Sequence, residues 1–221
     1  MIRLRMAFQP IHDIRNKRII GYEALMRPKK GQSPLALLQR AQKRGNIVDL
    51  DESARRLAVK DVASVLDNDQ LLFLNTEPES LESIDLWQPW PYNIDPSKVV
   101  IEITERSISE AVYPACDYLH ELGVNIALDD FGVGTSNLWM VDRFKPHFVK
   151  ADRSFLGCKA KGNALEALVS MTSVINAQLI VEGVETETDV AYLHKIGVKL
   201  AQGFYLGVPT YVEDLLVASH A

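Results

Sequence analysis

The segment NIALDD, residues 125–130, is a short apolar run that ends in two adjacent carboxylates, Asp129 and Asp130. Six more apolar runs end in a carboxylate, a carboxamide or a lysine: RIIGYEAL (18–25), LLFLN (71–75), VVIEITE (99–105), HFVKAD (147–152), LIVEGVE (179–185) and KLAQG (199–203). Buried carboxylates are costly unless they are paired, so this recurrence indicates one site built from many strand ends. Oxygen ligands gathered in this way suit hard divalent cations.

Amphipathic stretches separate these runs, which is the pattern of βα units around a parallel sheet. We expect strands near 3–8, 19–25, 71–75, 99–103, 125–129, 147–151, 178–182 and 199–202, and helices near 34–44, 51–66, 108–122, 137–144, 163–176, 187–196 and 211–219. Polar residues follow nearly every strand, whereas an open sheet gathers its ligands at one crevice. The pattern therefore favours an α/β fold of the TIM-like (β/α)8 barrel type.

The first two strands are an exception to the repeating pattern. Only HDIRNKR (12–18) connects them, which is too short for a crossover helix. We therefore expect an antiparallel first strand and an irregular barrel. The Pro- and Trp-rich segment 85–98 is expected to be an ordered surface loop.

Composition sets limits on the function. The 221 residues are 47% hydrophobic and 24% charged, which fits a single domain over 1–221. The net charge of −5 argues against binding a nucleic-acid polymer, which needs a basic face. We find neither a signal peptide nor a run of membrane-spanning length, so we expect a cytoplasmic protein with no membrane insertion. In that compartment Cys116 and Cys158 are expected to be free thiols.

The Asp129–Asp130 pair can be interpreted in two ways. Where a strand ends and unwinds, both carboxylates can turn toward one site and share two cations. Alternatively, they cap a turn into the Gly-rich segment FGVGTSN (131–137). Glu102 and Glu105 stand three apart, so they cannot both point inward from one regular strand. We assign Glu102 to a metal and Glu105 to the neighbouring loop.

Single residues at the other strand ends also have alternative roles. Asn75 is either a neutral oxygen ligand or a turn residue. A buried Lys150 needs an acidic partner, and it either orients or deprotonates a water or forms an ion pair with Asp152 or a nearby Glu. Arg27 can clamp a phosphate or be a surface cation. Glu182 and Glu185 flank a glycine in a segment that also resembles a helix start.

Taken in order, these motifs resemble the EAL-domain cyclic di-GMP phosphodiesterase family, as a stand-alone EAL domain. GYEALMRP (21–28) contains the Glu-Ala-Leu signature, and the other landmarks are FQPI (8–11), LN (74–75), EITE (102–105), ALDDFGVG (127–134), VKADRSF (149–155), EGVET (182–186) and QGFYLGVP (202–209). The resemblance implies a barrel with an antiparallel first strand. It also implies hydrolysis of cyclic di-GMP to linear pGpG by a water activated by two Mg²⁺ or Mn²⁺ ions per site.

The resemblance also implies roles for individual residues. These are metal ligands Glu23, Asn75, Glu102, Asp129, Asp130 and Glu182; catalytic residues Lys150, Glu182 and Glu23; substrate contacts Gln9, Arg27 and Gln202; and supporting residues Glu105, Asp152 and Glu185. Cyclic di-GMP is the implied partner, with a homodimer as a further possibility.

Several positions depart from the family pattern. The loop reads FGVGTSN where the family usually has FGTGYSS, so Val133, Thr135 and Asn137 bear on activity. Two alternatives to the enzyme are a catalytically inactive EAL domain that acts as a cyclic di-GMP receptor and a protein-interaction module. Inactive members typically lose a metal carboxylate or the lysine, and this chain keeps them, which favours the enzyme.

Overall fold

The computed structural model describes residues 4–28, 32–62, 65–104, 109–132, 141, 143–156 and 162–218. Its strands are β1 (Arg5–Asp13), β2 (Arg18–Arg27), β3 (Leu71–Asn75), β4 (Val99–Thr104), β5 (Asn125–Phe131), β6 (Phe148–Ala151), β7 (Gln178–Val181) and β8 (Leu200–Ala201). Its helices are α1 (Pro34–Lys43), α2 (Ile47–Val62), α3 (Pro78–Leu81), α4 (Tyr113–Glu121), α6 (Gly162–Val174), α7 (Glu187–Ile196) and α8 (Val212–Ala218). Among these residues no helix is long and apolar enough to cross a membrane.

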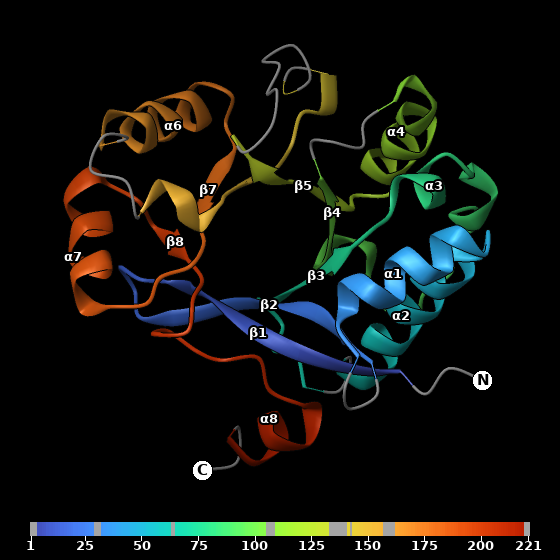
Figure 1. Ribbon diagram of the computed structural model, residues 1–221. Coiled ribbons are helices and arrows are strands. Elements are labelled where there is room, and N and C mark those ends of the chain that lie inside the picture. The colour runs from blue at the N-terminus through green and yellow to red at the C-terminus, as the bar shows by residue number, and fades with distance from the viewer. Residues whose placement is uncertain are drawn as a thin grey trace.

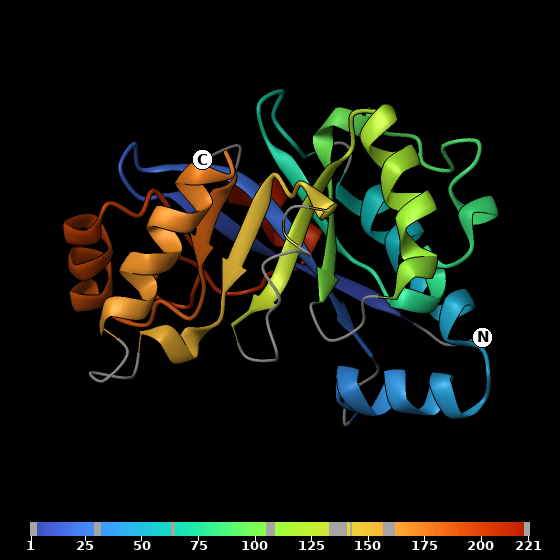
Figure 2. The ribbon, with the colours of Figure 1, turned by 90° about the horizontal axis from the view of Figure 1, so that it is seen from above.

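The strands close into a barrel in the order β1 to β8, which confirms the predicted fold class. β1 pairs antiparallel with both β2 and β8, and all the other neighbours are parallel. Figure 1 looks into the barrel, with α1 to α4, α6 and α7 around its outside and α8 next to β1. Figure 2 shows the arrowheads of β4 and β5 pointing to the same end of the barrel. Side chains at the carboxyl ends of the parallel strands therefore gather there.

Apolar packing fills the barrel in two layers, one inside it and one between the strands and the helices. The inner layer consists of one side chain from most strands: Ile11, Phe73, Val100, Ala127, Phe148, Ile180 and Leu200. Outside the strands, α2 places Ala54, Ala58 and Val62 in the same core as Leu72 and Leu74. Residues four apart share one face of a helix, and small side chains there let α2 lie close to the strands.

Two predictions of local structure need comment. The prediction of a surface loop over 85–98 is wrong for two of its aromatic residues, Trp87 and Tyr92. Trp87 is fully buried and its indole Nε1 donates to the carbonyl of Ser80 at 3.0 Å, and Tyr92 is buried beside it. These two large rings anchor the segment to the core, whereas Gln88, Pro89, Asn93, Asp95 and Ser97 are exposed. The helix predicted over 137–144 falls mostly outside the described residues.

Candidate active site

A layer of polar side chains lies directly beyond the apolar layer inside the barrel. Strand side chains alternate in direction, so the residue two positions beyond an inward-facing one also faces inward. Two positions after Phe73, Val100, Ala127, Phe148, Ile180 and Leu200 stand Asn75, Glu102, Asp129, Lys150, Glu182 and Gln202. β1 runs the other way, and there Gln9 precedes Ile11 by two. The barrel therefore gathers these predicted site residues at one end.

Lys150 stands at the centre of this layer. Its Nζ atom lies 2.7 Å from a Glu102 oxygen, 2.8 Å from Glu182, 3.2 Å from Asp129 and 3.4 Å from Glu23. Its side chain is only 1% exposed. The ion-pair interpretation of Lys150 is thus correct, but its partners are these four carboxylates and not Asp152. The Asp152 carboxylate accepts instead from the backbone N–H of Ser154 at 2.9 Å.

Four carboxylates around one ammonium leave an excess of negative charge in a buried place. Burial raises the pKa of Glu102 well above its ordinary value, against the opposing attraction of Lys150. Burial also raises the pKa of Glu182 to about 7, with Asp129 and Glu23 adding to the effect. For Lys150 burial acts downward, but the carboxylates outweigh it and raise the pKa well above the usual range. Lys150 therefore remains a charged hydrogen-bond donor.

Glu23, from β2, is the most fully hydrogen-bonded carboxylate of the group. Its Oε1 accepts from Asn75 Nδ2 at 3.0 Å, and its Oε2 accepts from Gln202 Nε2 at 2.7 Å. Burial acts to raise the pKa of Glu23, but Lys150 and these two amides outweigh burial and lower it. Glu23 is therefore held as a fixed carboxylate anion that links β2, β3 and β8.

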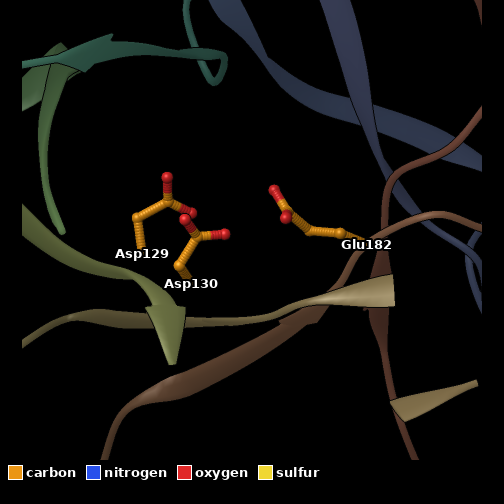
Figure 3. Close-up of side chains that lie close together, drawn as sticks. All are labelled: Asp129, Asp130 and Glu182. Atoms are coloured by element: carbon orange, nitrogen blue, oxygen red, sulfur yellow. The ribbon is translucent and has the colours of Figure 1, made fainter. Parts of the chain in front are cut away.

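A break in the ladder of β5 lets two adjacent aspartates face the same site. The register between β5 and β6 shifts between Leu128 and Phe131, and Asp130 has a positive φ of 53°. Asp is one of the few non-glycine residues that adopts this conformation readily. Oxygens of Asp129, Asp130 and Glu182 come within 4.8 Å of one another, and Figure 3 shows the three carboxylates facing a common space. This arrangement corresponds to the unwound strand end inferred from the sequence.

The donor set fits a divalent cation. Glu102 Oε2 and Gln202 Oε1 are buried and accept no hydrogen bond from any described residue. Unpaired buried acceptors are costly, and the surplus carboxylates need positive charge beyond that of Lys150. Carboxylate and carboxamide oxygens are the ligands that Mg²⁺ and Mn²⁺ prefer. The residues around Asp129, Asp130 and Glu182 therefore suit such an ion.

A cavity of about 210 Å³ opens beside this cluster. Its walls are Gln9, Glu23, Asp152, Arg153, Glu182, Gly183, Glu185, Gln202, Gly203 and Phe204. Gln9 is held by a hydrogen bond from its Nε2 to the carbonyl of Gly207 at 3.1 Å. Two of the wall side chains, Arg153 and Phe204, had no predicted role. Both lie inside motifs that carry the family resemblance, VKADRSF (149–155) and QGFYLGVP (202–209), directly after a strand end.

Two predicted site residues lie elsewhere or cannot be placed, Arg27 and Glu105. Arg27 lines a second cavity of about 260 Å³ that also includes Asn75, so it lies near the site but not in the first cavity. Glu185 lies on the rim of the first cavity, just before α7. Thr186 and Asp189 form a capping box there, so the helix start inferred from this segment is also present. Glu105, like Val133, Thr135 and Asn137, lies outside the described residues.

Comparison with known proteins places the chain in a family. The EAL domain model matches residues 2–209. The curated relative named "Probable cyclic di-GMP phosphodiesterase PdeN", from Escherichia coli strain K12, is 29% identical over 235 residues, which cover 96% of this chain and 44% of that protein. The chain spans less than half the length of the first curated relatives it matches.

Two solved structures extend the comparison to three dimensions. The PaMucR phosphodiesterase in complex with c-di-GMP matches with a TM-score of 0.87 and 27% identity, over 96% of this chain and 94% of that one. The manganese and cyclic di-GMP complex of BlrP1 from Klebsiella pneumoniae matches with a TM-score of 0.82 and 25% identity, over 95% of this chain and 56% of that one. With a family model that matches nearly its whole length, this chain belongs to the EAL domain family.

Proposed function

We propose that this EAL domain is a metal-dependent phosphodiesterase that hydrolyses one phosphodiester bond of cyclic di-GMP and releases linear pGpG. The observation that carries the proposal is the buried cluster at the carboxyl end of the barrel. There a single ammonium, Lys150, lies within 3.4 Å of four carboxylates, beside a cavity. Several relatives are named for this activity, which supports the same conclusion.

Two Mg²⁺ or Mn²⁺ ions are proposed for the site. Glu23, Asn75, Glu102 and Asp129 would hold the first ion, and Asp129, Asp130 and Glu182 would hold the second. When bound, divalent ions neutralise phosphate charge and make water a better nucleophile at neutral pH. The surplus of carboxylates and the unpaired oxygens near Lys150 support this donor set.

Lys150 and Glu182 are both proposed to act on the attacking water. Because neighbouring carboxylates keep Lys150 protonated, it acts by donating a hydrogen bond that orients the water, and not by removing its proton. Glu182 lies 2.8 Å from Lys150 and faces Asp129 and Asp130, so it would hold the second ion and orient the water beside it. Attack on phosphorus then depends mainly on positioning.

The remaining predicted residues have proposed supporting roles. Gln9 and Gln202, both on the wall of the first cavity, would contact the substrate, and Arg27 would do so from the neighbouring cavity. Asp152 shapes the turn after β6, and Glu185 stands on the cavity rim. Glu105 is proposed to anchor the loop after Asp130.

The test is to incubate purified protein with cyclic di-GMP and Mg²⁺ or Mn²⁺ and to separate the products by chromatography. We expect pGpG with either ion, none in EDTA and none from Glu23→Ala, whose fold circular dichroism checks. Full activity of Glu23→Ala would remove Glu23 from the set of metal ligands. Binding without turnover, measured by calorimetry, would identify a receptor instead. Neither binding nor turnover would leave a protein-interaction module.

The setting of the reaction is also a proposal. We place the domain in the cytoplasm, where the surrounding chemistry is reducing, and expect no insertion into a membrane. A homodimer remains a prediction from the family resemblance, and sedimentation of the purified protein tests it.

A further inference from the structure

Arg153 is the only cationic side chain on the wall of the first cavity among the residues that the structure describes. The same wall carries the carboxylates of Glu23, Asp152, Glu182 and Glu185. A ligand that brings phosphate groups into this cavity meets negative charge on several sides. Ions held at Asp129, Asp130 and Glu182 offset that charge at one end only, because Coulomb interactions weaken with distance and solvent.

The backbone holds the Cα and Cβ atoms of Arg153 beside the carboxylate cluster. The turn Arg153–Phe155 begins directly after Asp152, whose side chain caps it. Gly183, next to Glu182, has a φ of 70°, and a Cβ built there would lie 2.1 Å from the Arg153 Cβ. The absence of a side chain at Gly183 therefore makes room for the stem of Arg153, which packs against the residue that follows Glu182.

The guanidinium itself is available to a ligand. The Arg153 side chain is 74% exposed, and its nearest described acidic partner is Glu185 at 3.8 Å. An exposed pair at this distance is weak, so the guanidinium exchanges readily for another anion. The two non-bridging oxygens of a phosphodiester can accept two hydrogen bonds from one planar guanidinium, which is a strong, bidentate arrangement.

We propose that Arg153 is a substrate-binding residue that holds a phosphate of cyclic di-GMP at the mouth of the cavity. This inference rests on the proposed function of the site. It adds Arg153 to the anion contact predicted for Arg27, which lines the other cavity. Arg153 leaves Glu185 when the phosphate enters, so Glu185 keeps the guanidinium near the cavity until a ligand arrives.

The test compares Arg153→Ala and Arg153→Lys with Arg18→Ala. Arg18 is a matched control because it also has an exposed ion pair, with Asp69 at 2.8 Å, at the far end of β2 from the site. Steady-state kinetics in Mg²⁺ gives KM and kcat, and calorimetry in EDTA gives Kd for cyclic di-GMP. A lost charged hydrogen bond should raise KM and Kd about 10-fold in Arg153→Ala. We expect kcat within about 2-fold of wild type, because the contact is made before and during the reaction.

The other variants separate phosphate binding from alternatives. Arg153→Lys should keep most of the affinity, because an ammonium also binds phosphate, and Arg18→Ala should match wild type. The slope of log Kd against log salt should fall in Arg153→Ala. Unchanged KM and Kd in Arg153→Ala would overturn the proposal. A second pair of results would also overturn it: Arg153→Lys does not restore the affinity, and Arg153→Ala no longer discriminates cyclic di-GMP from cyclic di-AMP. Together these results would indicate that Arg153 contacts a guanine edge and not a phosphate.

Failure of the proposed function gives a different result. If wild type binds cyclic di-GMP without turnover, the Kd values still decide the role of Arg153. If wild type neither binds nor hydrolyses it, both proposals fall together.

Discussion

Two groups of buried charged side chains in this fold differ in their ratio of positive to negative charge. In α2 the side chain of Arg55, 2% exposed, forms an ion pair with Asp51 one turn earlier. At the carboxyl end of the barrel Lys150, 1% exposed, faces four carboxylates. Both cations are out of water, but only the first has an equal charge opposite it.

Neutral groups complete the contacts of the Arg55–Asp51 pair. Arg55 Nε donates to the Tyr92 hydroxyl at 2.7 Å, and its guanidinium lies 4.7 Å from the Trp87 ring centre. The Asp51 carboxylate also accepts from the backbone N–H of Glu77 at 3.2 Å. These contacts join α2 to the aromatic segment before β4. Because the charges match and the polar atoms have partners, the group can be stable without a ligand.

The cluster around Lys150 lacks such partners for all its charges and acceptors. Its carboxylates outnumber its cation, Glu102 keeps an oxygen that accepts no hydrogen bond from the described residues, and burial raises the pKa of Glu182 to about 7. A protein tolerates such a group where a ligand completes it. The comparison therefore separates a pair that holds the fold together from a cluster that holds ions.

The largest expected effect is on turnover in Lys150→Ala. Loss of the one ammonium that the described residues bring to the cluster should lower kcat about 10²–10⁴-fold, the range for a positioned proton-transfer or water-orienting group. Kd for cyclic di-GMP should change much less, because Lys150 is proposed to act on the water. Lys199→Ala, at an exposed lysine directly before β8, is the control. An equal loss in affinity and turnover would show that Lys150 only binds substrate.

The next effect is on stability, in Arg55→Ala. Removal of one partner leaves Asp51 as a buried, unpaired charge, so unfolding should become easier by about 3–5 kcal/mol. Urea denaturation in EDTA measures the change. Replacing both partners, as in Asp51→Leu with Arg55→Met, should recover much of the loss because no charge is then stranded. A loss below about 1 kcal/mol in Arg55→Ala would contradict a structural role for the pair.

A smaller effect is the pH dependence of stability in EDTA. The folded pKa of Glu182, about 7, lies above the ordinary value of 4.5, so the folded state binds the proton more tightly. The resulting stability is fully present below the ordinary pKa and is lost as pH rises through 7. The loss is at most about 3 kcal/mol by linkage. Denaturation of wild type and Glu182→Gln at about pH 5 and about pH 8 should show a steeper loss in wild type.

Added Mg²⁺ should cancel most of that pH dependence, because a divalent ion compensates the Glu182 carboxylate at high pH. Identical pH profiles for wild type and Glu182→Gln would mean that Glu182 is not the group held partly protonated.

The residues of the polar layer could be predicted from the sequence because each obeys a local rule. Glu102, Asp129 and Lys150 each follow an inward-facing apolar residue by two positions at the end of a parallel strand, so strand geometry alone brings them together. The antiparallel β1 was predictable for a similar reason, because a seven-residue connection is too short for a crossover helix.

Contacts between distant segments could not be predicted in this way. The partners of Arg55 include Tyr92, 37 residues away, and nothing in the pattern of α2 indicates that an aromatic segment covers it. Arg153 was missed because its place in the cavity depends on the room left by Gly183 of another strand end. Asp130 was predicted to face the site, but the positive φ and the shift in register that let it do so could not be read from the sequence.

The smallest expected effect comes from Arg56, the neighbour of Arg55 in α2. Arg56 also pairs with an acid one turn earlier, Glu52 at 2.7 Å, but its side chain is 53% exposed. Water already solvates both charges, so Arg56→Ala should cost only about 0.2–1 kcal/mol in urea denaturation. The cost should fall further in high salt, whereas that of Arg55→Ala should not. Equal losses in the two variants would mean that burial does not distinguish these pairs, and the same reasoning applied to Lys150 would then fail.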